Sequence, residues 1–161
     1  MSENSVAGNP LQRYFRQPKI YISLPSGGEY WGDNLEMTET GEFPVFAMTA
    51  KDELSFKTPD ALLNGQSTVD VIQSCVPNIK NAWHMPSIDL DAVLVAIRIA
   101  TYGEKMDVET TIPVIEEERT YQLDLRQILD QLTAVEFENV LTVDDLVIHL
   151  RPLTYQEFTR S

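Results

Sequence analysis

The chain has 161 residues, and its 25 acidic and 12 basic side chains give a formal net charge of −13. Such an acidic surface repels phosphate backbones, and the few basic side chains are scattered, so the composition argues against nucleic-acid binding. Hydrophobic residues make up 43% of the chain, which is enough for the core of one domain. The single cysteine excludes both an intramolecular disulfide and a thiolate-based zinc site within one chain.

The domain organisation follows from where the apolar residues begin. Residues 1–17 mix small polar side chains with a few larger ones, and we expect them to form a flexible or extended arm. Residues 18–161 are expected to form a single domain. No apolar secretory signal opens the chain, and the longest apolar stretch, residues 92–100, is too short to span a bilayer. We therefore expect no membrane partner and a reducing compartment such as the cytoplasm.

The first third of this domain predicts short strands. Aromatic and β-branched residues over 19–24 predict a strand, and Pro25-Ser26-Gly27-Gly28 predicts a turn in which the glycines supply positive φ. Residues 43–48 predict a second strand. The apolar residues of 54–56 are expected to begin or end another.

The stretch from Thr49 to Gly103 predicts several short helices. Thr58 is placed to cap a helix that ends at Asn64-Gly65. Ser67 is placed to cap a second helix, where Asp70 can complete a capping box, and that helix is expected to end near Pro77.

The longest predicted helix covers residues 88–102. Ser87 is its expected cap, and Asp89 and Asp91 lie near its positive dipole end. Gly103 is expected to end it in a left-handed conformation. Because this helix is apolar on most sides, we expect it to be largely buried.

The remaining third predicts hairpins and short helices. Period-two alternation over 105–112 and a returning strand over 119–123 predict a β-hairpin around the turn at 113–118. The further predicted elements are a helix over 125–132, strands over 136–141 and 144–150, and a terminal helix over 152–158 with Thr154 as its cap and Tyr155 and Phe158 as docking residues. The fold class is therefore expected to be α+β, with short capped helices in a central block flanked by mostly antiparallel strands and β-hairpins.

The sequence offers no convincing catalytic or metal-binding constellation. His84 and His149 lie far apart and neither has the spacing of metal ligands. Asp89 and Asp91 are explained by the first turn of a helix, and Asp144-Asp145 by a turn between strands. Without a paired nucleophile and base we expect no enzyme activity, no cofactor and no small-molecule substrate.

Several side chains are candidates for contact with another protein. Aromatic residues in irregular segments either pack at the edge of the domain or serve as anchors for a partner chain. These residues are Tyr14, Phe15, Tyr30, Trp31 and Phe43. Arg98, in the mostly apolar longest helix, is expected to be a paired or interface charge.

Five segments together resemble the T4-type bacteriophage baseplate protein family, over roughly residues 20–128. The segments that carry the resemblance are residues 24–28, 48–53, 57–65, 72–83 and 88–103. The resemblance implies a protein of the baseplate hub of contractile-tailed phages, or a factor in hub assembly, with no enzyme activity. The implied partners are other tail and baseplate proteins, including the hub and the tape measure, and the implied location is the virion tail, assembled in the host cytoplasm.

One departure from the family concerns a hairpin. Relatives carry a Cys-Pro-x-Cys pair before a Tyr-x-Leu-Asp-Leu segment, whereas this chain has Ile112-Pro113-Val114-Ile115 before residues 121–125. Both sulfur positions are isoleucine, so we expect no bound zinc.

Two other functions remain open at this point. A cytoplasmic chaperone that holds the tape-measure or hub protein, and is absent from the finished virion, is compatible with the strong acidity. A peptidoglycan hydrolase carried in the tail is disfavoured, because it needs placed carboxylates or a metal site.

Overall fold

The computed structural model describes residues 16–57, 65–112 and 117–160. Its elements in chain order are β1 (Ile20–Ile22), a 3-10 turn (Gly32–Asn34), β2 (Phe43–Val45), α1 (Ala50–Lys57), α3 (Gln66–Cys75), a second 3-10 turn (Ala82–His84), α4 (Ser87–Tyr102), β3 (Lys105–Ile112), β4 (Glu117–Asp124), α5 (Leu125–Ala134), β5 (Val140–Val143), β6 (Leu146–His149) and α6 (Tyr155–Arg160). The strands of the described residues form three antiparallel pairs, β1–β2, β3–β4 and β5–β6. The α+β class is confirmed.

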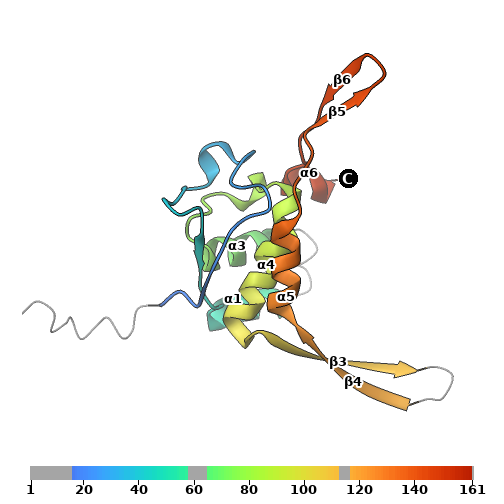
Figure 1. Cartoon of the computed structure of the whole chain (residues 1–161). Coiled ribbons are helices and arrows are strands. Elements are labelled where there is room, and N and C mark those ends of the chain that lie inside the picture. Colours follow the sequence, from blue (N-terminus) through green and yellow to red (C-terminus); the bar gives the residue numbers. More distant parts are fainter. Residues whose placement is uncertain (1–15, 58–64, 113–116, 161) are drawn as a thin grey trace, which may run out of the picture.

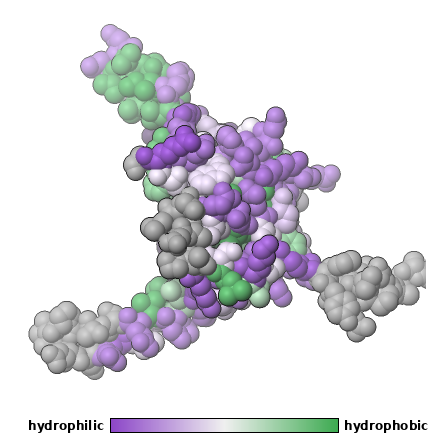
Figure 2. Space-filling view, turned by 180° about the vertical axis from the view of Figure 1, so that it is seen from behind, coloured by the Kyte–Doolittle hydropathy of each residue, from purple (hydrophilic) through white to green (hydrophobic). Residues whose placement is uncertain are grey.

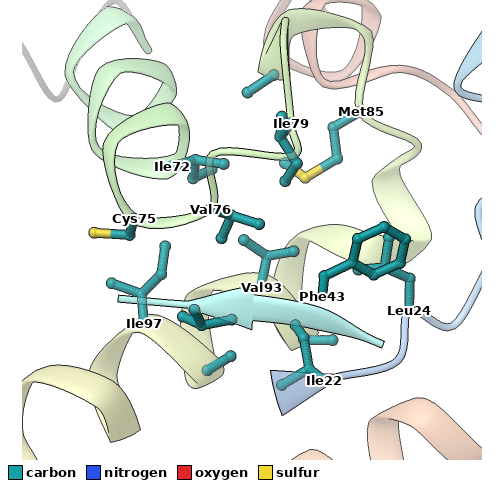
Figure 3. Packing of buried hydrophobic residues seen from close by; sticks show 14 of the residues in the cluster. Ile22, Leu24, Phe43, Ile72, Cys75, Val76, Ile79, Met85, Val93 and Ile97 are labelled. Atoms are coloured by element: carbon teal, nitrogen blue, oxygen red, sulfur yellow. The ribbon is translucent and has the colours of Figure 1, made fainter. Parts of the chain in front are cut away.

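The core lies between the β1–β2 pair and helices α3 and α4 (Figure 3). Ile22 of β1 is in register with Phe43 of β2, and both side chains are buried. Ile72 of α3 and Val93 of α4 supply further fully buried apolar side chains. Burial of such side chains is the main favourable contribution to folding, so this cluster fixes how the central helices sit.

Helix α4 is the centre of the arrangement, and α5 packs beside it in the opposite direction (Figure 1). The β3–β4 hairpin connects one end of α4 to the start of α5. The β5–β6 hairpin follows the other end of α5 and leads into α6. Both hairpins project away from the helical body, in different directions.

The expected strand at 54–56 is wrong, because these residues belong to α1. A capping box starts this helix: the Thr49 hydroxyl accepts from the Asp52 amide at 3.2 Å, and the Asp52 carboxylate accepts from the Thr49 amide at 2.9 Å. Ser74 of α3 also donates to Asp52 at 2.8 Å, which ties α1 to its neighbour. The apolar–polar–apolar pattern of 54–56 fits a strand locally, but the cap five residues upstream decides for a helix.

The expected cap at Ser67 is also wrong. Helix α3 begins at Gln66, and its N-cap is Gly65 with a φ of 77°. A Cβ on Gly65 would lie 3.0 Å from the Trp83 ring, so both the backbone and the packing require glycine there. Ser67 lies buried inside the first turn, and Asp70 accepts from Gln66 at 2.7 Å instead of closing a capping box.

The other predicted helix ends agree with the structure to within a few residues. Helix α3 ends at Cys75, two residues before Pro77. The expected cap at Ser87 is wrong, because Ser87 is the first residue of α4 and Pro86 holds the cap position, where no side chain caps the helix. Gly103 has a positive φ of 96°, as expected for the residue that ends α4. The helix expected after Thr58 and most of the turn expected at 113–118 lie outside the described residues.

The hairpin predicted from 105–112 and 119–123 is confirmed as β3–β4, paired from Lys105–Asp124 to Ile112–Glu117. The helix predicted over 125–132 is confirmed as α5. Of the strand predicted over 136–141, residues 136–139 lie outside any strand, and β5 continues past 141 to Val143. The strand predicted over 144–150 is β6, which begins after the Asp144-Asp145 turn.

The terminal helix is confirmed as α6, with Thr154 as its cap. The Thr154 hydroxyl accepts from the Glu157 amide at 3.2 Å, and the Glu157 carboxylate accepts from the Thr154 amide at 3.3 Å. Tyr155 is buried and stacks on Trp83, with ring centroids 5.5 Å apart. The end of the described chain is therefore packed onto the helical body.

An ion pair beside this cap predicts a pH-dependent attachment of α6. The Arg151 guanidinium donates to both oxygens of Glu157, at 2.9 and 3.0 Å, and with the Thr154 bonds it lowers the pKa of Glu157 from 4.5 to about 2. Because the folded pKa lies below the unfolded one, the ionised carboxylate stabilises the attachment above about pH 4.5, and this contribution is lost as the pH falls toward 2.

We expect the carboxyl carbon resonance of Glu157 to titrate near pH 2 in the native protein and nearer 4.5 in Arg151→Ala. Carbon-detected NMR over this pH range measures both midpoints. Equal midpoints in the two proteins would show that Arg151 does not hold the carboxylate ionised.

Candidate protein-interaction surface

The most exposed features of the described chain are the two projecting hairpins (Figure 1). We call residues 139–150 the β5–β6 arm and residues 105–124 the β3–β4 arm. The tip of the β3–β4 arm, residues 113–116, lies outside the described residues. Neither arm contributes a strand to the β1–β2 pair of the core. The β3–β4 arm packs Met106, near its base, against the core cluster.

One face of the β5–β6 arm is entirely apolar. Leu141 is in register with Ile148, and Val143 with Leu146, so these four side chains share a face. Leu141 is 45% exposed, Val143 48% and Leu146 62%. Figure 2 shows this arm as a mostly hydrophobic projection from an otherwise mixed surface. Contiguous apolar area of this kind marks contact sites for other proteins.

The opposite face of the same arm is half apolar and half polar. Val140 is in register with His149, and Thr142 with Val147. Val147 is 54% exposed and Val140 45%. An antiparallel pair with one wet face normally alternates apolar and polar residues. This face keeps two polar residues, Thr142 and His149, but Val140 and Val147 are also exposed on it, so the arm exposes apolar side chains on both faces.

Main-chain hydrogen bonds close the base of the β5–β6 arm and attach the segment that follows it to the body. The Leu150 amide donates to the Asn139 carbonyl at 2.7 Å, which closes the two sides of the arm. Beyond it, the Tyr155 amide donates to the Met85 carbonyl at 2.8 Å. The arm is therefore a hairpin held at its root.

The β3–β4 arm has one polar face and one face that is apolar near its base. Lys105 and Asp124 form an ion pair of 3.1 Å at its base. The other face pairs Met106 with Leu123 and Val108 with Tyr121. Tyr121 is 49% exposed, so this face offers a smaller apolar contact surface than the β5–β6 arm.

The structure contradicts the interface prediction for Trp31 and Phe43. Each side chain is 1% exposed and belongs to the core. Tyr30 is partly buried and meets Phe137 edge-on, with ring centroids 5.9 Å apart. Tyr14 and Phe15 lie outside the described residues. Their part in a contact, and that of Tyr30, stays a prediction.

Arg98 lines a groove of about 330 Å³ between α1 and α4. Its guanidinium lies 4.9 Å from the centre of the Tyr102 ring, a cation–π contact. Its Nε is buried without a hydrogen-bond partner among the described residues. Met48 and Leu94 line the same groove. An interface role for Arg98 stays a prediction.

Asp89 has a structural role that the sequence did not reveal. The sequence explained it only as a charge near the positive dipole end of a helix. Asp89 is 0% exposed and accepts from the Ser26 amide at 2.8 Å, from the Ser26 hydroxyl at 2.5 Å and from the Trp31 indole at 2.8 Å. Burial raises its pKa, and the hydrogen bonds from Ser26 and Trp31 oppose that rise. The carboxylate is enclosed by its three donors, so it ties the turn at 25–31 to α4 and offers no reactive oxygen to a substrate.

The described residues contain no cluster with the form of a metal site. No group of three His, Cys, Asp or Glu side chains in 16–57, 65–112 and 117–160 lies close enough to hold a metal ion. Cys75 is fully buried, and desolvation raises its pKa to about 11, so its thiolate is disfavoured near neutral pH. The expectation of no zinc stays a prediction, because residues 113–116 belong to the hairpin concerned.

Over the same parts of the chain, no helix combines the length and hydrophobicity needed to cross a membrane.

Comparison with known protein families identifies the family of this chain. A family model described as "T4 bacteriophage base plate protein" matches residues 17–161. The match includes both arms and α6, and so extends beyond the residues 20–128 that carried the resemblance. No curated protein and no solved structure matches the chain.

Proposed function

The chain belongs to the T4 bacteriophage base plate protein family, and from this premise we propose that it is a non-enzymatic structural or assembly protein of the hub region of a contractile tail. It acts through protein–protein contacts with other tail proteins, among them the hub and the tape measure. The observation that carries the proposal is the pair of hairpin arms, which project from the body and expose apolar side chains.

Two features of the body support a role in contact over a role in chemistry. Its most buried carboxylate, Asp89, accepts hydrogen bonds from three donors inside the protein. Its cysteine, Cys75, is buried in the core with a raised pKa. Both groups therefore serve the fold, while the arms carry the exposed apolar surface.

A second candidate is an assembly chaperone for the tape-measure or hub protein. The exposed apolar β5–β6 arm, joined to a chain of net charge −13, is also what a soluble holder of an apolar client needs. A chaperone of this kind leaves its client before the virion is complete. The two candidates therefore differ in whether the finished tail contains the protein.

Quantitative mass spectrometry of purified tails tests the proposal. We expect the protein in a fixed number of copies per tail, retained after washing at high salt, because contacts built on apolar surface are insensitive to ionic screening. Absence from tails, together with loss of soluble tape-measure or hub protein when the gene is deleted, would favour the chaperone. Tails purified from a phage lacking the gene provide the background control.

A further inference from the structure

The β5–β6 arm has the composition of a hairpin that is covered on both faces. Six of the eight residues in Val140–Val143 and Leu146–His149 are Val, Leu or Ile. Strands that read as nearly continuous apolar runs are those buried on both sides. An isolated two-stranded hairpin is marginally stable in water, so this arm gains most from a partner that encloses it.

The body of the chain does not provide that enclosure. The arm points away from α4 and α5 and touches the body at its root (Figure 1). The residues nearest its tip are the most open, with Leu146 62% exposed. A flat partner surface can cover only one face of a projecting hairpin, whereas a cleft covers both.

The negative charge at the tip of the arm indicates a positively charged partner surface. Asp144 and Asp145 form the turn and are exposed, and residues 139–150 contain no lysine or arginine. Asp144 has a positive φ of 55°, as is usual in the tight two-residue turns that join hairpin strands. Moving a carboxylate from water into a cleft costs desolvation free energy unless a cation pairs with it there. The receiving cleft therefore carries Lys or Arg where the tip ends.

A second copy of this chain does not fit this description. Each copy carries a net charge of −13, so two copies repel each other. The groove beside Arg98 and Lys57 is apolar with two cations, but its volume of about 330 Å³ suits a small ligand and not a hairpin. Glu53 also lines that groove and opposes an acidic tip.

We propose that the β5–β6 arm inserts into an apolar cleft of a different tail protein, whose Lys or Arg side chains meet Asp144 and Asp145. Leu141, Val143, Leu146 and Ile148 fill one wall of that cleft, and Val140 and Val147 the other. The choice of a tail protein as the partner rests on the proposed function.

Site-specific photo-crosslinking in infected cells tests this insertion. Leu146→p-benzoylphenylalanine places the probe on the apolar face beside the tip, and Tyr21→p-benzoylphenylalanine is the control on an exposed position of the body, 54% exposed. We expect the Leu146 probe to crosslink to one phage protein other than this one, at an apolar segment next to Lys or Arg. We expect no such product from the Tyr21 probe. Crosslinks to a second copy, within the same chain, or to no protein would overturn the proposal.

The charge at the tip is tested by Asp145→Lys in the presence of the Leu146 probe. We expect the crosslink yield to fall on the order of tenfold, because like charges then meet in the cleft. Asp145→Asn is the matched neutral control and should lose less. Exchange of the crosslinked partner's Lys or Arg for Glu should restore the yield with Asp145→Lys. An unchanged yield in Asp145→Lys would contradict a basic cleft.

The two proposals fail separately in these experiments. A Leu146 crosslink to another phage protein, combined with absence from purified tails, would remove the structural role but retain the inserted arm. Presence in tails without such a crosslink would retain the structural role and remove the insertion.

Discussion

Asp89→Ala is expected to lower the free energy of unfolding by roughly 3–5 kcal/mol. The substitution leaves the Ser26 amide, the Ser26 hydroxyl and the Trp31 indole without their acceptor in a buried site. Each buried donor that loses its partner costs about 1–3 kcal/mol. Urea or guanidinium denaturation at neutral pH measures the loss.

Asp89→Asn tests the same network more finely. An amide can accept through only one of its two heavy atoms, so either the Ser26 amide or the Trp31 indole faces an N–H group, and we expect a loss of roughly 1–3 kcal/mol. Asp91→Asn, an exposed site two residues along the same helix, is the matched control and should change stability by about 0.5 kcal/mol or less. Equal effects at the two positions would show that the helix dipole, and not the buried network, explains Asp89.

Phe43→Ala is the second large expected effect, a loss of roughly 3–5 kcal/mol in the free energy of unfolding. Phe43 is 1% exposed and is in register with Ile22 across the β1–β2 pair, so truncation leaves a cavity in the core. The substitution also separates two interpretations of this residue. A core side chain stabilises the isolated protein, whereas an interface anchor affects only the complex.

Tyr21→Ala is the control for this measurement, because Tyr21 lies in the same strand pair and is 54% exposed. We expect it to cost less than about 1 kcal/mol. Denaturation of the purified protein in the absence of partners gives both values. If Phe43→Ala were no more destabilising than Tyr21→Ala, the assignment of Phe43 to the core would be wrong.

The projecting arms show how local pattern and tertiary position contribute separately. Period-two alternation predicted the β3–β4 hairpin, and strands over 136–141 and 144–150 with a turn at Asp144-Asp145 predicted the second hairpin in outline. Nothing in these patterns distinguishes an apolar hairpin that packs on its own body from one that projects. The sequence therefore predicted the strands of the interaction surface without identifying them as that surface.

The opposite error occurred for Trp31 and Phe43. Both fall in irregular or short segments, which made an exposed position plausible. Their burial depends on Asp89 and on Ile22, which come from other parts of the chain. The polar end of the Trp31 indole is satisfied 58 residues away in the sequence, a pairing that no local pattern reveals.

The α+β class, the hairpins and the terminal cap at Thr154 could be predicted from the chain alone, because caps, turns and periodicity act over a few neighbouring residues. The baseplate family could be predicted from five segments that resemble it. Tertiary structure alone decided that Asp89 is a buried anchor, that Trp31 and Phe43 are core, and that residues 139–150 stand clear of the body. Burial is a property of the assembled core, in which segments about sixty residues apart meet. For that reason the strands of the β5–β6 arm could be predicted locally, while their exposure could not.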